Sequence, residues 1–244
     1  MEKTLLPNLD RIDQSKLLLD GSYTFPASAG KGINVYVIDT GINIKHVEFG
    51  DRAKVGGRFC DGPGCDTDND DKGHSSHITG IIGGKTVGVA NQVNLISVKI
   101  LDANVPVIKA MSFSNKNTVV NMSVGSFYLA AFNNVVKSLT DASAHVVSAA
   151  GNNATDACFV SPASAPEAIM VGALEEKTDV LAKYSNVGNS APHVSGAITL
   201  IIAKEGNKSP AEMAKTIINL STKYLLDPMT LSGTPNNILR IPPP

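Results

Sequence analysis

The chain of 244 residues lacks the features that mark several large classes of protein. Its formal net charge is −1, and it contains no block of Lys or Arg, so it has no electrostatic footprint for nucleic acid or an anionic membrane. No apolar stretch approaches the roughly 20 residues that span a bilayer. We therefore expect neither nucleic-acid nor membrane partners, and we expect a monomer.

Cysteine is scarce, and its three positions do not form a metal-binding pattern. Four residues separate Cys60 from Cys65, and no second pair follows, so we predict no metal centre built on thiolates. Cys60 and Cys65 could instead form a disulfide in an oxidising compartment. The opening MEKTLLPNLDRIDQ shows no secretory signal, so either the protein stays inside the cell or its targeting segment is absent from this sequence.

What the sequence does contain is an alternation of strand and helix signals. With 43% hydrophobic residues, a chain of this length can bury a large core. We predict one domain over residues 1–244, a three-layer α/β fold around a mostly parallel, doubly wound sheet. The predicted strands lie at 33–38, 93–101, from Thr118, at 145–152 and near Ile169, and the helices from His74, at 105–113, from Leu129, from Ala191 and after Ser209.

The apolar run INVYVIDTG, residues 33–41, is the centre of this pattern. It is short and rich in β-branched residues, which is typical of a strand buried on both faces. Asp39 stands where the strand ends, and ligands of open α/β sheets bind beyond the carboxyl ends of the strands. Asp39 is therefore a candidate for chemistry, although it could also only cap the following turn.

Three polar residues are predicted to meet at this edge of the sheet. Asp39 ends a strand, His74 begins a helix, and Asn152 follows the strand HVVSAA. An acid, then a histidine, with a serine later in the chain is the order of the subtilisin triad, in which the acid orients the imidazole that takes the serine proton. Asn152 could aim its amide at an oxyanion, or it could be an ordinary turn residue.

Six blocks along the chain resemble the signature blocks of the subtilisin-like serine proteases. They are YVIDTG around Asp39, GHSSH around His74, NMSVG around Ser123, SAAGNN around Asn152, SPASAP at 161–166 and APHVSG from Ala191. The resemblance runs from about Leu9 to the end of the chain and is greatest to the fungal proteinase K and vacuolar proteinase B branch. It implies a secreted or vacuolar serine endopeptidase that acts on proteins or peptides without a metal in the reaction.

The resemblance also implies a role for each matching residue. Asp39 and His74 correspond to the acid and base of the triad, and Asn152 corresponds to the oxyanion donor. The residues that correspond to the backbone strand pairing with extended substrate are Ser123, Val124 and Gly125. Four histidines fall outside these roles, and we interpret them as structural: His46, His77, His145 and His193.

The nucleophile block departs from the family pattern. The family reads GTSMA, a small residue and then PHV, which places its serine four residues before the proline. Here Ser190 stands two residues before Pro192, and an offset of two turns a side chain by about 200° around a helix. The simplest alignment deletes the nucleophile, so that the Ser190 hydroxyl lies outside bonding reach of His74. In the alternative, GNS replaces GTS and the loop brings Ser190 round as the nucleophile.

The resemblance also implies that the chain is shortened relative to the family, around 102–106 and around 186–190. The first segment lacks the glycine and serine stretch that forms one wall of the family's substrate cleft. Cys158 lacks the partner cysteine of its branch, and Ser75 replaces a glycine of the usual GHGTH.

An acidic loop precedes His74. Its carboxylates could hold a structural calcium ion, or they could belong to a solvated loop, because their spacing matches no complete EF-hand. No cofactor is required for the predicted chemistry. The acidic residues are Asp61, Asp66, Asp68, Asp70 and Asp71.

Three functions are consistent with these features. The first is a subtilisin-like endopeptidase with the triad Asp39, His74 and Ser190. The second is a catalytically inactive relative that keeps the fold and binds peptides along Ser123–Gly125. The third, an unrelated α/β binding domain, does not account for the ordered blocks.

Overall fold

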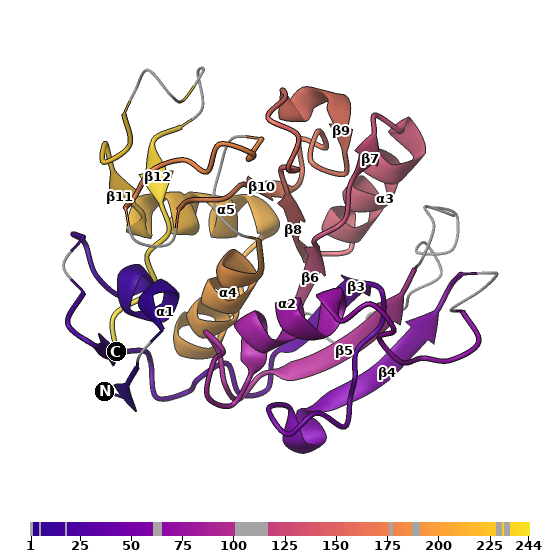
Figure 1. Cartoon of the computed structure of the whole chain (residues 1–244), viewed down its shortest axis with the longest axis horizontal. Helices are drawn as coiled ribbons and strands as arrows, with labels where there is room; N and C mark the ends of the chain where they lie inside the picture. The colour runs from indigo at the N-terminus through magenta and orange to yellow at the C-terminus, as the bar shows by residue number, and fades with distance from the viewer. Residues whose placement is uncertain are drawn as a thin grey trace.

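Figure 1 shows a computed structural model of the protein, in which an open sheet is covered by helices. The structure describes residues 2–4, 6–17, 19–60, 65–100, 117–175, 178–186, 191–227, 231 and 235–244. Several sequence predictions lie wholly or partly outside these residues: the helix at 105–113, the shortening around 102–106 and around 186–190, the position of Ser190, and Asp61 as a candidate calcium ligand.

The central sheet has six strands, and every neighbouring pair is parallel. Their order across the sheet is β10-β8-β6-β3-β5-β4. The predicted α/β architecture with a mostly parallel sheet is therefore confirmed. The strands are β3 (Asn34–Asp39), β4 (Ala53–Arg58), β5 (Asn94–Lys99), β6 (Thr118–Met122), β8 (His145–Ala149) and β10 (Ile169–Val171).

Strand β3 lies inside the sheet, as its apolar run predicted. Val35 and Val37 contribute to the core on one face, whereas Tyr36 and Ile38 contribute to the core on the other. This alternation follows from the two-residue period of a strand. Because both faces are covered, β3 is apolar from Val35 to Ile38, between Asn34 and Asp39.

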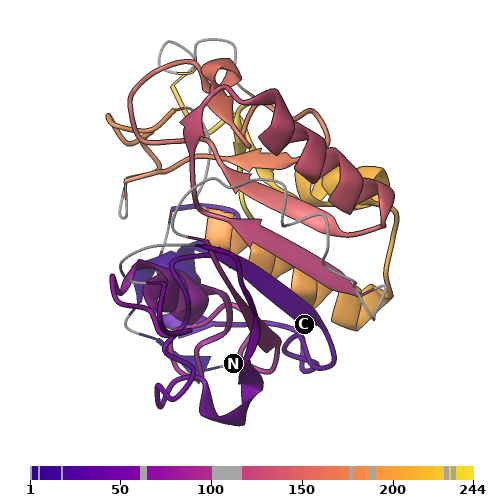
Figure 2. The same ribbon diagram turned by 90° about the vertical axis from the view of Figure 1, so that its right-hand side faces the viewer.

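Helices cover both faces of the sheet and produce the three layers (Figure 2). Apolar residues of α2, α4 and α5 pack on the face of Val35 and Val37, and those of α3 pack on the opposite face. The bounds of the helices in these layers are α2 (His74–Gly83), α3 (Ala130–Asp141), α4 (Ala191–Glu205) and α5 (Pro210–Leu220).

The two C-terminal helices follow their sequence signals closely. Helix α4 is buried along most of its length, which agrees with its apolar composition on every side. Helix α5 begins with a capping box, in which the Ser209 hydroxyl accepts from the backbone N–H of Glu212 and the Glu212 side chain accepts from the backbone N–H of Ser209. Pro210 occupies the first turn, where no backbone donor is needed.

Smaller elements surround the sheet, and the two ends of the chain lie near each other (Figure 1). The backbone N–H of Ile241 donates to the carbonyl of Ile12, which joins the C-terminal tail to the N-terminal region. The remaining elements are α1 (Pro7–Ile12), the 3-10 helices η1 (Gly50–Arg52) and η3 (Ala157–Phe159), and the antiparallel pairs β1 (Glu2–Lys3) with β2 (Ser22–Tyr23), β7 (Ser126–Phe127) with β9 (Val160–Ser161), and β11 (Thr222–Lys223) with β12 (Asn237–Ile238).

The order of the strands explains why polar residues gather beyond β3. From β3 the chain builds β4 and β5 on one side, and then crosses to build β6, β8 and β10 on the other. The direction of winding reverses between β3 and β6, and in such sheets this reversal opens a crevice at the carboxyl ends of the strands. Asp39 is the last residue of β3, so it lies at this crevice.

Candidate active site

Asp39 is fully buried at the end of β3. Its Oδ1 accepts a hydrogen bond from the backbone N–H of Thr40 at 2.7 Å and lies 2.9 Å from Nδ1 of His74. Its Oδ2 is buried and has no hydrogen-bond partner among the described residues. One oxygen of the carboxylate therefore faces the imidazole, and the backbone N–H of Thr40 fixes the position of that oxygen.

His74 is the first residue of α2, and the predicted proximity to Asp39 is present. Its side chain is 55% exposed, so the ring is accessible to solvent while Nδ1 is paired with the buried carboxylate. The hydrogen bond that His74 donates to Asp39 raises the pKa of His74 above its usual value, burial opposes this rise, and the charges of Asp39 and Asp70 add to it. An imidazole oriented in this way can act as a general base once it is neutral.

Replacing Asp39 with Asn is expected to lower the pKa of His74, because it removes the hydrogen bond and the charge that raise it. In the native chain, protonated His74 stabilises the fold below the unfolded-state pKa, and this contribution disappears as the pH rises through the raised pKa. The measurement is an NMR titration of the His74 ring in both proteins. An unchanged pKa in Asp39→Asn would show that the pair is not formed in solution.

Asn152 lies in the loop after β8 and is exposed. The loop is held from inside by Asn186, whose side chain is fully buried. The Asn186 Nδ2 donates to the carbonyl of Ala150 at 3.0 Å, and Oδ1 accepts from the backbone N–H groups of Asn153 at 3.1 Å and Thr155 at 2.8 Å. The loop thus bends around one amide and leaves Asn152 at the surface.

Gly151 is required at this bend. Its φ of +104° is rarely adopted by residues with a side chain, and an added Cβ would lie 2.6 Å from Nδ2 of Asn186. The block SAAGNN therefore has a geometric reason for its glycine. Strand β8 itself ends at Ala149, three residues earlier than the predicted end at Asn152, because the backbone turns into this bend.

Ser123, Val124 and Gly125 connect β6 to β7 and belong to neither strand. The pairing of β6 with β8 ends at Met122, and that of β7 with β9 begins at Ser126. Two hydrogen bonds link the start of this segment to α4. The Ser195 hydroxyl of α4 donates to Oδ1 of Asn121 at 2.9 Å, and Nδ2 of Asn121 donates to the Ser123 hydroxyl at 3.0 Å. The segment is thus anchored at its start by buried polar contacts.

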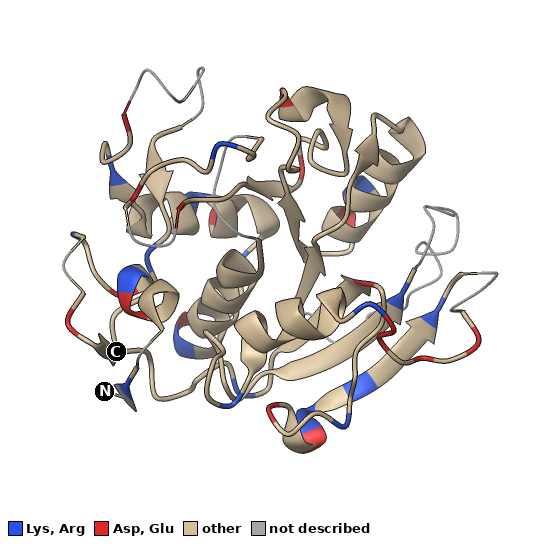
Figure 3. Ribbon diagram, viewed as in Figure 1, with Lys and Arg blue, Asp and Glu red and all other residues tan. Residues whose placement is uncertain are grey.

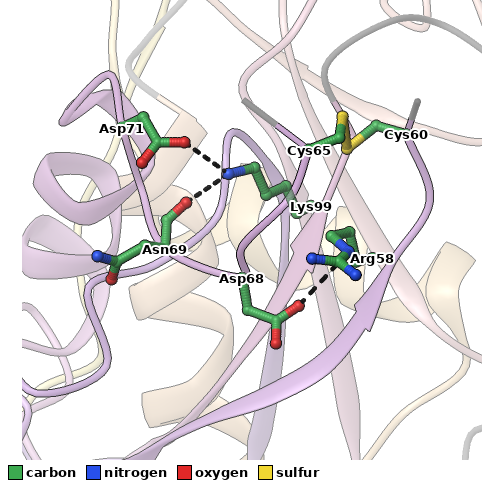
Figure 4. Close-up of a disulfide and its surroundings, with 7 residues drawn as sticks. All are labelled: Arg58, Cys60, Cys65, Asp68, Asn69, Asp71 and Lys99. Atoms are coloured by element: carbon green, nitrogen blue, oxygen red, sulfur yellow. Dashed lines mark hydrogen bonds and ion pairs between the residues drawn. A yellow bond between two sulfur atoms is a disulfide. The ribbon is translucent and has the colours of Figure 1, made fainter. Parts of the chain in front are cut away.

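The acidic loop before α2 is packed onto the protein through some of its carboxylates (Figure 4). Asp71 pairs with Lys99 at 3.1 Å, and Lys99 also donates to the carbonyl of Asn69 at 2.5 Å. The Lys99 side chain is 1% exposed, so this pairing satisfies a buried cation. The Asp71 side chain itself remains 48% exposed, so the loop is solvated at this residue even though its carboxylate is paired.

Calcium binding by this loop stays a prediction. Within the described part of the chain, no three His, Cys, Asp or Glu side chains are grouped to hold a metal ion. Asp61 lies outside the described residues, and Asp68 approaches Arg58 at 4.0 Å.

A disulfide joins Cys60 to Cys65 beside this loop, the pairing that the sequence allowed for an oxidising compartment (Figure 4). Cys158 is a free and exposed thiol. The structure thus assigns the two neighbouring cysteines to each other and leaves the third without a partner cysteine.

The other histidines make local contacts away from the pair of Asp39 and His74. His193 Nε2 lies 2.9 Å from Nδ2 of Asn8, and His145 Nε2 lies 2.7 Å from Oδ1 of Asn207. The ring of His46 lies against Phe49, with 5.5 Å between the ring centres. These contacts agree with the structural role that we assign to the three residues.

Ser75, which follows His74, has a fully buried side chain whose hydroxyl has no hydrogen-bond partner among the described residues. Because an unpaired buried hydroxyl is destabilising, Ser75→Ala is expected to raise the free energy of unfolding by about 1 kcal/mol. The matched variant Ser76→Ala should lower it, since the Ser76 hydroxyl accepts from the backbone N–H of Asn43 at 2.9 Å. Urea denaturation distinguishes the two, and a loss of stability in Ser75→Ala would show that its hydroxyl is paired.

The structure therefore brings Asp39 and His74 together and places Asn152 and Ser123–Gly125 in loops that follow β8 and β6. Ser190 lies outside the described residues, so its position stays a prediction. Sequence reasoning missed the role of Asn186. Its burial and its hydrogen bonds to the segment 150–155 depend on residues more than 30 positions away, which no local pattern shows.

The sequence profile of the subtilase family, peptidase S8, matches residues 30–191. This span covers more than half of the chain and includes Asp39, His74 and Asn152. The chain therefore belongs to the subtilase family, in agreement with the resemblance of its sequence blocks.

Individual relatives agree with this assignment. The chain is 37% identical over 239 residues to subtilisin-like protease 2 of Pseudogymnoascus destructans, covering 82% of this chain and 59% of that protein. It is 44% identical over 182 residues to proteinase T of Parengyodontium album, covering 69% of this chain and 61% of that protein. The chain thus spans about three fifths of the length of these fungal relatives.

A solved structure shares the fold over the whole length of both chains. The crystal structure of a cold-adapted subtilisin-like serine proteinase superposes with a TM-score of 0.86 at 27% sequence identity and covers 100% of each chain. The fold is subtilisin-like, as predicted.

None of the helices in the described ranges combines the length and the apolar character of a membrane span.

Acidic residues follow one another along the loop between β4 and α2, whereas elsewhere the two signs of charge are interspersed (Figure 3).

Proposed function

We propose that this chain is a subtilisin-like serine endopeptidase by descent and by the acid–base pair of its site, and that its hydrolysis of peptide bonds is weak or absent. The observation that carries the proposal is the pairing of Asp39 Oδ1 with His74 Nδ1 at 2.9 Å. A buried carboxylate that orients a solvent-accessible imidazole is the acid–base arrangement of acyl transfer to a serine. The proposed substrates are proteins and peptides.

Each remaining step of the reaction has a candidate residue. Asp39 holds the imidazole, and neutral His74 would take the proton of the nucleophile and return it to the leaving amine. Asn152, exposed on its loop, would donate its amide to the oxyanion. Ser190 is the candidate nucleophile in the chain, and its place two residues before Pro192 is the reason to expect little activity.

An oxidising location, secreted or vacuolar, is part of the proposal. The disulfide between Cys60 and Cys65 supports it, because disulfides form and persist in oxidising compartments.

Digestion of an unfolded protein at high concentration of the chain tests the proposal, with the products identified by mass spectrometry. Slow cleavage at internal bonds that disappears in His74→Ala would support an endopeptidase. Cleavage that persists in both His74→Ala and Asp39→Ala would contradict the assignment of the acid–base pair.

A second candidate function is peptide binding without cleavage, which the offset of Ser190 favours. An extended peptide would pair with the backbone of Ser123–Gly125, which lies in no strand of the described sheets. The matched variants Gly125→Pro and Gly125→Ala test it by fluorescence anisotropy of a labelled peptide. Proline removes the backbone donor and should abolish binding, whereas alanine keeps it, with its Cβ 3.4 Å from Val160. Equal binding by both variants would place the peptide elsewhere.

A further inference from the structure

Among the described carboxylates of the acidic loop, Asp70 accepts the largest number of hydrogen bonds. Its Oδ1 accepts from the Thr40 hydroxyl at 2.8 Å and from the backbone N–H groups of Gly73 at 2.9 Å and Lys72 at 3.2 Å. Its Oδ2 accepts from the backbone N–H of Ser76 at 2.7 Å. These bonds lower the pKa of Asp70, although burial opposes them, so the group stays charged over the physiological range.

These partners belong to the two segments that carry the acid–base pair. Thr40 directly follows Asp39, and Gly73 and Ser76 flank His74 in the chain. Asp70 therefore ties the end of β3 to the first turn of α2. A further hydrogen bond joins the same two segments directly, because the Thr40 hydroxyl accepts from the backbone N–H of Ser75 at 3.4 Å.

The loop that carries Asp70 is itself fixed against β3. A Cβ added to Gly41 would lie 2.9 Å from the carbonyl oxygen of Asp68 and 2.8 Å from that of Asn69, so this backbone packs directly on the turn after Asp39. Lys99 of β5, which is in register with Asp39, holds Asn69 and Asp71 from the sheet. Asp70 is thus placed by the same strand ends that place the acid–base pair.

We propose that Asp70 is a positioning residue for His74, which it holds in the orientation that meets Asp39. The inference rests on the proposed function in that it gives Asp70 a role toward the imidazole of the acid–base pair. A carboxylate that merely capped α2 would need its bonds to Gly73 and Ser76 alone. The bond from Thr40 is the contact that makes it a link between the two catalytic segments.

The test is an NMR study of the full chain that follows the His74 ring and its Nδ1 proton. In Asp70→Asn the pKa of His74 should fall, because a nearby negative charge is lost. The Nδ1 proton should also exchange faster with water, because the imidazole is held less firmly against Asp39. Neither readout requires hydrolysis, so a chain without protease activity still tests the inference.

Asp68→Asn is the matched control. It removes the same charge two residues earlier, from a half-exposed carboxylate that lies 4.0 Å from Arg58 and is not among the groups that shift the pKa of His74. It should leave both the pKa and the Nδ1 proton unchanged. Equal effects of the two variants would mean that Asp70 acts on His74 only through its negative charge, and would overturn the proposal.

Thr40→Val separates positioning from charge, since it removes the hydroxyl and keeps Asp70. Faster exchange of the Nδ1 proton in Thr40→Val supports the link, and it does so even if Asp70→Asn fails to fold. If Asp70→Asn or Thr40→Val lowers stability while the Nδ1 proton of His74 is unaffected, Asp70 is only a helix cap and the proposal is wrong.

Discussion

Peptide hydrolysis by the purified chain is expected to be about 10⁶-fold slower than hydrolysis by an intact subtilisin-like relative, the loss in turnover that removal of the nucleophile causes in subtilisin, a member of the same family. The physical reason is the two-residue offset of Ser190 in the sequence, because an offset of two residues corresponds to a rotation of about 200° around a helix. A serine that cannot reach His74 is not activated, because its proton has no acceptor.

The comparison of Ser190→Ala with the unchanged chain decides this prediction. We expect equal rates, because a misplaced hydroxyl contributes nothing to turnover. The corresponding serine-to-alanine variant of the intact relative should lose about 10⁶ in the same assay and fall to the rate of this chain. A loss of 10³-fold or more in Ser190→Ala would mean that Ser190 acts as a nucleophile.

The second large effect is a loss of stability in acid, caused by His193. Burial lowers the pKa of this residue to about 4, and the charge of His77 adds to the effect. A folded-state pKa below the unfolded value of 6.5 means that the unfolded chain binds the proton more tightly. Stability should therefore fall by about 3 kcal/mol as the pH falls from 6.5 to 4, and burial of His145 lowers the pKa of that residue in the same direction.

Asn8→Asp tests this origin of the acid sensitivity. It places a carboxylate 2.9 Å from Nε2 of His193, which would favour the protonated ring and raise its pKa. Urea denaturation at pH 7 and at pH 4.5 should show a smaller loss of stability in Asn8→Asp than in the native chain. Asn134→Asp, at an exposed position of α3, is the control and should behave like the native chain. Equal losses in Asn8→Asp and Asn134→Asp would exclude His193 as the cause.

Much of the fold could be predicted because burial determines composition locally. The run before Asp39 is apolar since β3 is covered on both faces, and the capping box before α5 involves residues only three apart in the chain. Strand β4 was not predicted, because it contains two glycines, lies at the edge of the sheet and is largely exposed. Helix α1, also not predicted, is only six residues long.

Only the site residues that end a strand or begin a helix could be predicted. Asp39 and His74 follow from the topology and from the family resemblance, because each terminates or begins a regular element. The links that hold them, Asp70 to Thr40 and Asn186 to the loop of Asn152, depend on contacts between segments that are distant in sequence. A sequence pattern does not show which carboxylate of an acidic loop accepts such a bond, and Asp70 was accordingly grouped with the candidate calcium ligands.

The most direct test of the account is labelling with a fluorophosphonate probe, which reacts with an activated serine. The account predicts that the recombinant chain stays unlabelled under conditions in which an intact subtilisin-like relative is labelled. Labelling that mass spectrometry maps to Ser190, and that is lost in both Ser190→Ala and His74→Ala, would contradict it and show that the triad is complete.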